Sequence, residues 1–107
     1  MDFNTIINNI GDLFDFSPDL LDQTRNCYNQ SINHVSFARE LNNWSIDGKP
    51  THVYLLVACL FRAQKERGQK LTLISLINAF HSTTGIPMDQ YEAGRALVRL
   101  SFLERVS

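Results

Sequence analysis

The sequence has few cysteines, prolines and glycines, the residues that are abundant in disulfide-linked or extended chains. It contains only two cysteines, three prolines and five glycines in 107 residues. Two cysteines outside any Cys-x-x-Cys pattern exclude a disulfide-rich scaffold and favour free thiols in an intracellular protein. A hydrophobic content of 44% with 20% charged residues excludes a disordered chain and predicts one folded domain spanning residues 1–107.

Long apolar runs are missing as well. No segment approaches the ~20 apolar residues that a transmembrane helix needs. The first residues, Met1 to Asn4, carry no basic region of the kind that opens a secretory signal. We therefore expect no membrane partner and no secretory signal, and we expect a cytoplasmic protein.

The patterns that carry catalysis or metal binding are also absent. His34, His52 and His81 have no second ligand three or four residues away, which is the spacing that a helical metal site uses. The glycines are scattered and form no phosphate-binding loop. We therefore expect no enzyme, no metal and no cofactor, and we assign no catalytic residue.

Charge is distributed unevenly along the chain. Residues 1–48 contain seven acids and two bases, whereas residues 49–107 contain eight bases and four acids. A basic half suits an anionic partner such as a nucleic acid. Attraction between the two halves of the folded chain explains the same distribution equally well, and the sequence leaves both explanations open.

The first 44 residues show helical periodicity, with apolar residues three and four positions apart. Ser17-Pro18-Asp19 predicts a helix start, because serine caps, proline fits the first position and aspartate suits the positive end of the helix dipole. Residues 2–44 are thus predicted to form an N-terminal helical extension. Its three apolar stripes are Phe3, Ile6, Ile7, Ile10, Leu13 and Phe14; then Leu20, Leu21, Thr24 and Tyr28; then Ile32, Val35, Ala38 and Leu41.

The second half begins after the turn-forming segment Ser45 to Pro50. The segment Thr51–Arg67 predicts a central helix, since Val53 to Phe61 is apolar without interruption and needs neighbours on every face. Thr72 is the expected cap of the next helix. Asp89 is expected to start a last helix whose inward residues are Tyr91, Gly94, Leu97 and Val98. The predicted fold class is a compact all-α domain of five to six helices, in which only Phe102–Val106 has the character of a strand.

Three segments of this second half resemble successive elements of a known structural motif. Leu73 to Ala79 looks like a positioning helix, Ala96 to Leu100 like the end of a recognition helix, and Phe102–Val106 like the strand that follows. In this order residues 51–106 resemble the helix-turn-helix core of small winged-helix regulators, with at most a vestigial strand or wing. The resemblance implies a transcriptional regulator that binds double-stranded DNA.

The residues expected to contact nucleic acid are basic. Arg95 and Arg99 lie one helical turn apart, as groove or phosphate contacts require. An ion pair between Arg95 and Glu92, three residues earlier, is the alternative use of the same side chain. The full expected set is Arg95, Arg99, Arg62, Lys65, Lys70 and Arg105.

Two further expectations concern partners. The alternative function is a protein–protein adaptor or inhibitor, for example a phage- or plasmid-encoded protein that binds a host or defence complex, and it needs an exposed apolar or acidic patch. Trp44, Phe14 and Phe16 are its aromatic candidates, although burial in the core is the favoured role for all three. A homodimer is also expected, joined largely through residues 2–28. Its interface residues are Phe3, Ile7, Ile10 and Phe14.

Overall fold

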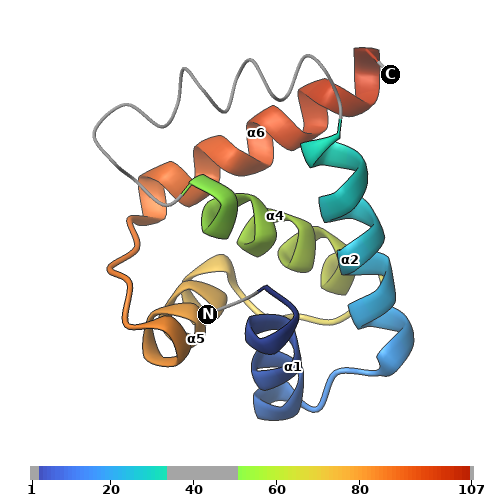
Figure 1. Cartoon of the computed structure of the whole chain (residues 1–107). Coiled ribbons are helices and arrows are strands. Elements are labelled where there is room, and N and C mark those ends of the chain that lie inside the picture. Colours follow the sequence, from blue (N-terminus) through green and yellow to red (C-terminus); the bar gives the residue numbers. More distant parts are fainter. Residues whose placement is uncertain (1–2, 34–50, 107) are drawn as a thin grey trace.

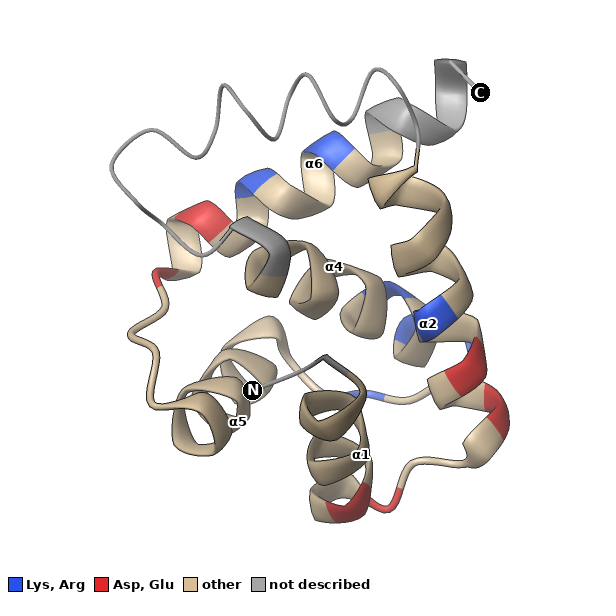
Figure 2. Ribbon diagram, in the orientation of Figure 1, with Lys and Arg blue, Asp and Glu red and all other residues tan. Residues whose placement is uncertain are grey.

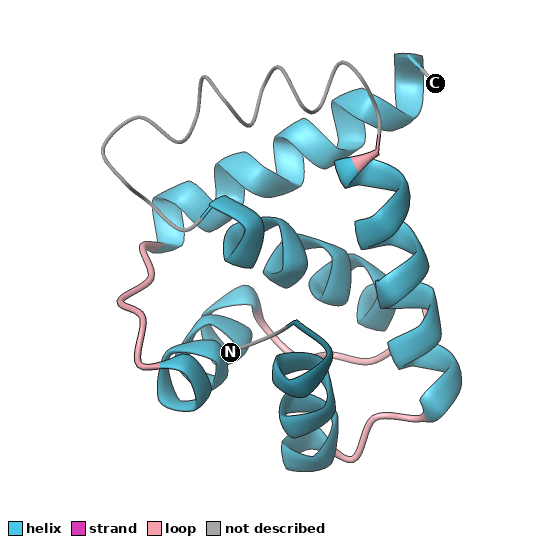
Figure 3. Cartoon of the chain, in the orientation of Figure 1, coloured by secondary structure: helices cyan, strands magenta, loops and turns pink. Residues whose placement is uncertain are grey.

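The structure is a computed structural model that describes residues 3–33 and 51–106, with side chains at 4–33 and 53–101. The described residues form helices and connecting loops only (Figure 3). The helices are α1 Phe3–Phe14, α2 Pro18–Ile32, α4 Thr51–Glu66, α5 Leu73–Thr84 and α6 Gln90–Val106. The all-α prediction is confirmed for this part of the chain. Val35, Ala38 and Leu41 of the third stripe, the turn at 45–50 and Trp44 lie outside the described residues.

Helix α4 lies at the centre of the fold, as predicted. It packs against α2, α5 and α6, while α1 packs against α5 and α2 (Figure 1). Every residue from Tyr54 to Leu60 is at most 3% exposed. One hydrophobic cluster joins side chains from all five helices, so α1 and α2 are part of the core rather than an appendage to it.

The helix ends follow the local signals in the sequence. The Ser17 hydroxyl accepts a hydrogen bond from the Leu20 amide at 3.2 Å, with Pro18 in the first turn. Thr72 caps α5 by accepting from the Ser75 amide at 3.1 Å. At the C-terminal end of α5, Gly85 has φ +72°, a left-handed conformation that glycine adopts without the steric cost of a Cβ.

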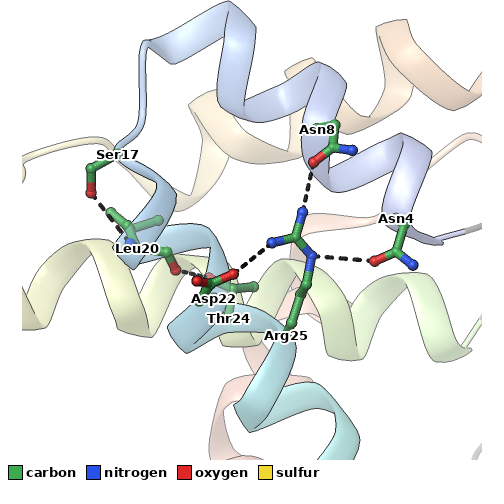
Figure 4. Close-up of polar contacts among 7 residues, drawn as sticks. All are labelled: Asn4, Asn8, Ser17, Leu20, Asp22, Thr24 and Arg25. Atoms are coloured by element: carbon green, nitrogen blue, oxygen red, sulfur yellow. Dashed lines mark hydrogen bonds and ion pairs between the residues drawn. The ribbon is translucent and has the colours of Figure 1, made fainter.

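The first two helices approach each other closely at Gly11. A Cβ added there would lie 2.7 Å from Cδ1 of Leu21. The contact is reinforced at the surface by Arg25 of α2, whose guanidinium donates to Asn4 and Asn8 of α1 and pairs with Asp22 (Figure 4). An arginine in the acidic half is therefore used to hold α1 against α2.

The end of the chain corrects one prediction. Residues 102–106, expected as a strand, continue α6 to Val106. The aromatic and aliphatic residues suggested a strand because they favour pleated structure, but no proline or glycine interrupts the helix after Gly94. A helix once started extends by one hydrogen bond per added residue, and here it runs through the segment.

Candidate functional site

Most of the described basic side chains expected to bind nucleic acid contact other residues of the chain. Arg62 forms an ion pair with Glu66 at 3.3 Å. The Lys65 ammonium lies 5.4 Å from the centre of the Phe61 ring. Lys70 is exposed in the loop between α4 and α5, and the side chain of Arg105 lies outside the described residues.

The acidic and basic halves of the chain meet between α2 and α4. The Gln23 side chain of α2 donates to the Glu66 carboxylate and accepts from Nε of Arg67 at 2.8 Å. Acidic and basic positions both lie at this edge of the molecule (Figure 2). Gln23 is uncharged, and Glu66 and Arg67 both belong to residues 49–107, so this contact joins the two halves through a neutral side chain.

The arginines of α6 are placed differently from each other. Arg95 forms an ion pair with Glu92 at 3.3 Å. This is the pair that the sequence analysis gave as the alternative to a nucleic-acid contact. Its side chain is 43% exposed, and its guanidinium lies 5.9 Å from the centre of the Tyr91 ring. Glu92 is only 5% exposed, so its carboxylate turns inward. Arg99 is half-buried.

The outward face of α6 carries two exposed apolar side chains. Tyr91 and Val98 are each 70% exposed, and because an α-helix turns about 100° per residue, two residues seven apart point almost the same way. Arg95 lies between them on the sequence and to one side of them on the helix. We call Tyr91, Arg95 and Val98 the outer face of α6.

This placement corrects the expected orientation of α6. Tyr91 and Val98 were expected to face inward. The residues that do face α4 are Ala93, Ala96 and Leu100, none more than 2% exposed; Leu97 packs beside them. Small side chains allow α6 to approach the bulky, apolar α4 closely. The alanines at 93 and 96, three residues apart, were the signal that sequence reasoning missed.

The expected dimer interface is corrected as well. Ile7 and Ile10 have no exposed surface, because they belong to the core that α1 shares with its neighbours. Phe14 packs partly against that core, 5.4 Å from the ring of Phe16; the side chain of Phe3 lies outside the described residues. The homodimer stays a prediction, but Ile7 and Ile10 offer a second copy no surface.

A second feature of interest is an open pocket between α2 and α4, of about 670 Å³. Polar and charged side chains surround it, and the thiols of Cys27 and Cys59 belong to its wall. Its lining residues are Asp19, Asp22, Gln23, Asn26, Cys27, Gln30, Ser31, Cys59, Arg62, Ala63, Glu66, Arg67 and Leu100. No local sequence pattern marks this site, because its residues come from helices that are distant in the sequence.

The two thiols differ in their surroundings. Cys59 on α4 is 1% exposed, whereas Cys27 on α2 is half-buried. The hydrogen bond between them lowers the pKa of Cys27 to about 7 against the opposing effect of burial, and the positive charge of Arg62 acts in the same direction. The same hydrogen bond, together with burial, raises the pKa of Cys59. Cys27 is therefore the thiol that ionises first.

Other candidate chemistry is not assembled in the described part of the chain. No group of three or more histidine, cysteine or acidic side chains there is placed to hold a metal ion. The ring of His81 contacts the loop that follows its own helix: its Nδ1 lies 2.9 Å from the Ile86 carbonyl oxygen. None of the described helices is both long and apolar enough to cross a bilayer.

Comparisons with protein-family models, with curated proteins and with solved structures found no match to this chain.

Proposed function

We propose that this chain is a non-enzymatic protein-binding module that recognises its partner through the outer face of α6. The observation that carries the proposal is the exposure of Tyr91 and Val98, each 70%, on one side of a helix whose opposite side is buried. Tyrosine and arginine are enriched among the residues that dominate binding energy at protein interfaces. Burying a residue of the size of Val98 contributes roughly 1.5–3 kcal/mol.

The chemistry of the outer face indicates what it would bind. Anchors at positions i, i+4 and i+7 of one helix fit the mode in which a helix lies in an apolar groove. Arg95 stands beside the two apolar anchors with its guanidinium partly exposed. We therefore infer a partner protein with an apolar groove and an acidic group at the rim, met in the cytoplasm, where free thiols such as Cys27 and Cys59 remain reduced.

Affinity capture tests this proposal. Tagged protein is incubated with nuclease-treated lysate of the native host, and bound proteins are compared among variants. We expect a partner that the wild type retains and that the double variant Tyr91→Ala, Val98→Ser loses. The matched control is Leu13→Ser, which removes a similarly exposed aliphatic residue (62%) from α1. Equal capture by all three proteins, or no capture by the wild type, would overturn the proposal.

A second candidate, a nucleic-acid-binding regulator, is favoured by the inward turn of Glu92. That carboxylate was an obstacle to DNA approaching α6, because acids repel phosphates, and its burial removes it from the exposed surface. Here Arg95 and Arg99 would contact the duplex.

Salt-titrated binding to duplex DNA tests the second candidate. Replacing Arg95 and Arg99 by alanine is expected to weaken binding by ~1–3 kcal/mol for a base contact, or to reduce the salt slope by about one per lost phosphate contact. A wild-type protein without salt-dependent affinity would remove this candidate and leave the protein-binding proposal intact.

A further inference from the structure

The thiols of Cys27 and Cys59 meet in the wall of the pocket between α2 and α4. They are 32 positions apart in the chain and belong to different helices, yet each lies close enough to the other to shift its pKa. Both line the same open pocket of about 670 Å³. Small molecules in solution can therefore approach Cys27, while Cys59 stays behind it at 1% exposure.

This arrangement gives the two sulfurs unequal roles. A thiolate, not a thiol, is the nucleophile, and Cys27 is the thiol whose ionised form its neighbours stabilise. Cys59 stabilises that form, and the Ser31 hydroxyl donates to the backbone carbonyl oxygen of Cys27 at 2.8 Å. The buried, protonated Cys59 is in place to act second, against the sulfur of Cys27.

The charged groups around the pocket set this balance. Arg62 of α4 favours the Cys27 thiolate, whereas Glu66 of the same helix disfavours it. Arg67 lines the pocket from the α4 side, and Asp19 and Asp22 line it from α2. Among the described side chains of α6, the apolar Leu100 lines the pocket.

We propose that Cys27 and Cys59 form a redox-modification site, at which a hydroperoxide entering the pocket oxidises the two thiols to an intramolecular disulfide. The Cys27 thiolate attacks the outer peroxide oxygen, the O–O bond breaks, and the leaving alkoxide takes a proton from water. This leaves a sulfenic acid at Cys27. The Cys59 sulfur then attacks the Cys27 sulfur, and the expelled hydroxide leaves as water with the Cys59 proton. In total, two thiols and one hydroperoxide give one disulfide, one alcohol and one water.

The product is a covalent link between α2 and α4. It joins the two helices across the pocket whose wall the thiols form. An added thiol reduces this disulfide by exchange through a mixed disulfide, is itself oxidised, and returns Cys27 and Cys59 to the thiol form. The site lies on α2 and α4 and requires nothing of the outer face of α6, so this proposal stands or falls separately from the proposed function.

Mass spectrometry of the native protein treated with hydrogen peroxide tests the proposal. Wild-type protein is expected to lose two hydrogens, to resist subsequent alkylation after denaturation, and to recover its original mass with dithiothreitol. The Cys59→Ser variant is expected to stop at a Cys27 sulfenic acid that dimedone traps. The Cys27→Ser variant is expected to keep Cys59 reduced while it stays folded, which circular dichroism checks.

A pH profile of alkylation on untreated protein distinguishes a poised thiolate from an ordinary exposed thiol. The rate at Cys27 is expected to rise through a midpoint near its pKa of about 7, below the ~8.5 of a free cysteine. At neutral pH the larger thiolate fraction, offset by lower intrinsic nucleophilicity, corresponds to about a threefold faster reaction at equal access. Only intermolecular disulfides after peroxide, or a wild type whose two thiols both stay reduced, would overturn the proposal.

Discussion

Helices α4 and α6 pack against each other, but their sequences reveal their positions to very different degrees. In α4 the residues from Tyr54 to Leu60 are apolar without interruption, so any rotation of the helix places apolar residues inward. In α6 apolar and polar residues are mixed around the helix, and the correct rotation depends on which apolar residues face α4. The structure turns the alanines inward and exposes Tyr91 and Val98.

The difference shows that residue size, as well as polarity, decides which side of a helix is buried. A neighbour as bulky as α4 leaves little room, and Ala93 and Ala96 let α6 approach it closely. Larger side chains at those positions would overpack the interface. The apolar residues that do not fit, Tyr91 and Val98, stay at the surface.

The largest expected effect comes from the central helix. Leu60→Ala removes a side chain that is 0% exposed, and it is expected to lower the free energy of unfolding by about 2–5 kcal/mol through lost burial and the cavity left behind. Val98→Ala on the outer face is expected to change it by less than about 0.5 kcal/mol. Urea denaturation measures both. Equal costs would contradict the contrast between the two helices.

A substitution by a larger side chain on the inner face of α6 tests the same comparison. Ala96→Leu places a large side chain where α6 meets α4 and is expected to cost about 1–3 kcal/mol through overpacking. Val98→Leu also enlarges a side chain, by one carbon rather than three, but on the exposed side, and it is expected to be neutral. Thermal melting compares the two variants. A stable Ala96→Leu protein combined with a destabilised Val98→Leu protein would mean that α6 is rotated the other way.

A smaller effect is expected at Arg95. Replacing a surface arginine usually changes the free energy of unfolding by no more than ~0.5 kcal/mol. The ion pair of Arg95 with the 5% exposed Glu92 changes this expectation to about 1 kcal/mol for Arg95→Ala, because the pair is half open to solvent. Lys70→Ala, in an exposed loop, is the control. Identical unfolding curves for both variants would show that the pair contributes nothing.

Much of the fold was predictable because its signals are local. Ser17, Thr72 and Gly85 mark helix ends through a side-chain oxygen or a missing Cβ, and each does so in the structure. The uninterrupted apolar run from Val53 also placed α4 correctly. These features depend on a few neighbouring residues and on no distant contact.

The candidate sites were less predictable because they depend on tertiary contacts. Cys27 and Cys59 come together only when α2 packs on α4, and no spacing rule covers two cysteines so far apart. The hydrogen bonds of the Gln23 side chain with Glu66 and Arg67 also form only when α2 packs on α4. Charge composition suggested a basic surface, but composition does not show which charges are turned toward each other.

The most direct test of the central claim, that the outer face of α6 is the recognition surface, is site-specific photocrosslinking. A photoreactive phenylalanine derivative replaces Tyr91 in one protein and Leu13 in another, and both are irradiated in nuclease-treated host lysate. The account predicts a discrete protein adduct from position 91 that position 13 does not give and that Val98→Ser weakens. Adducts that are the same at both positions, or none at position 91, would contradict it.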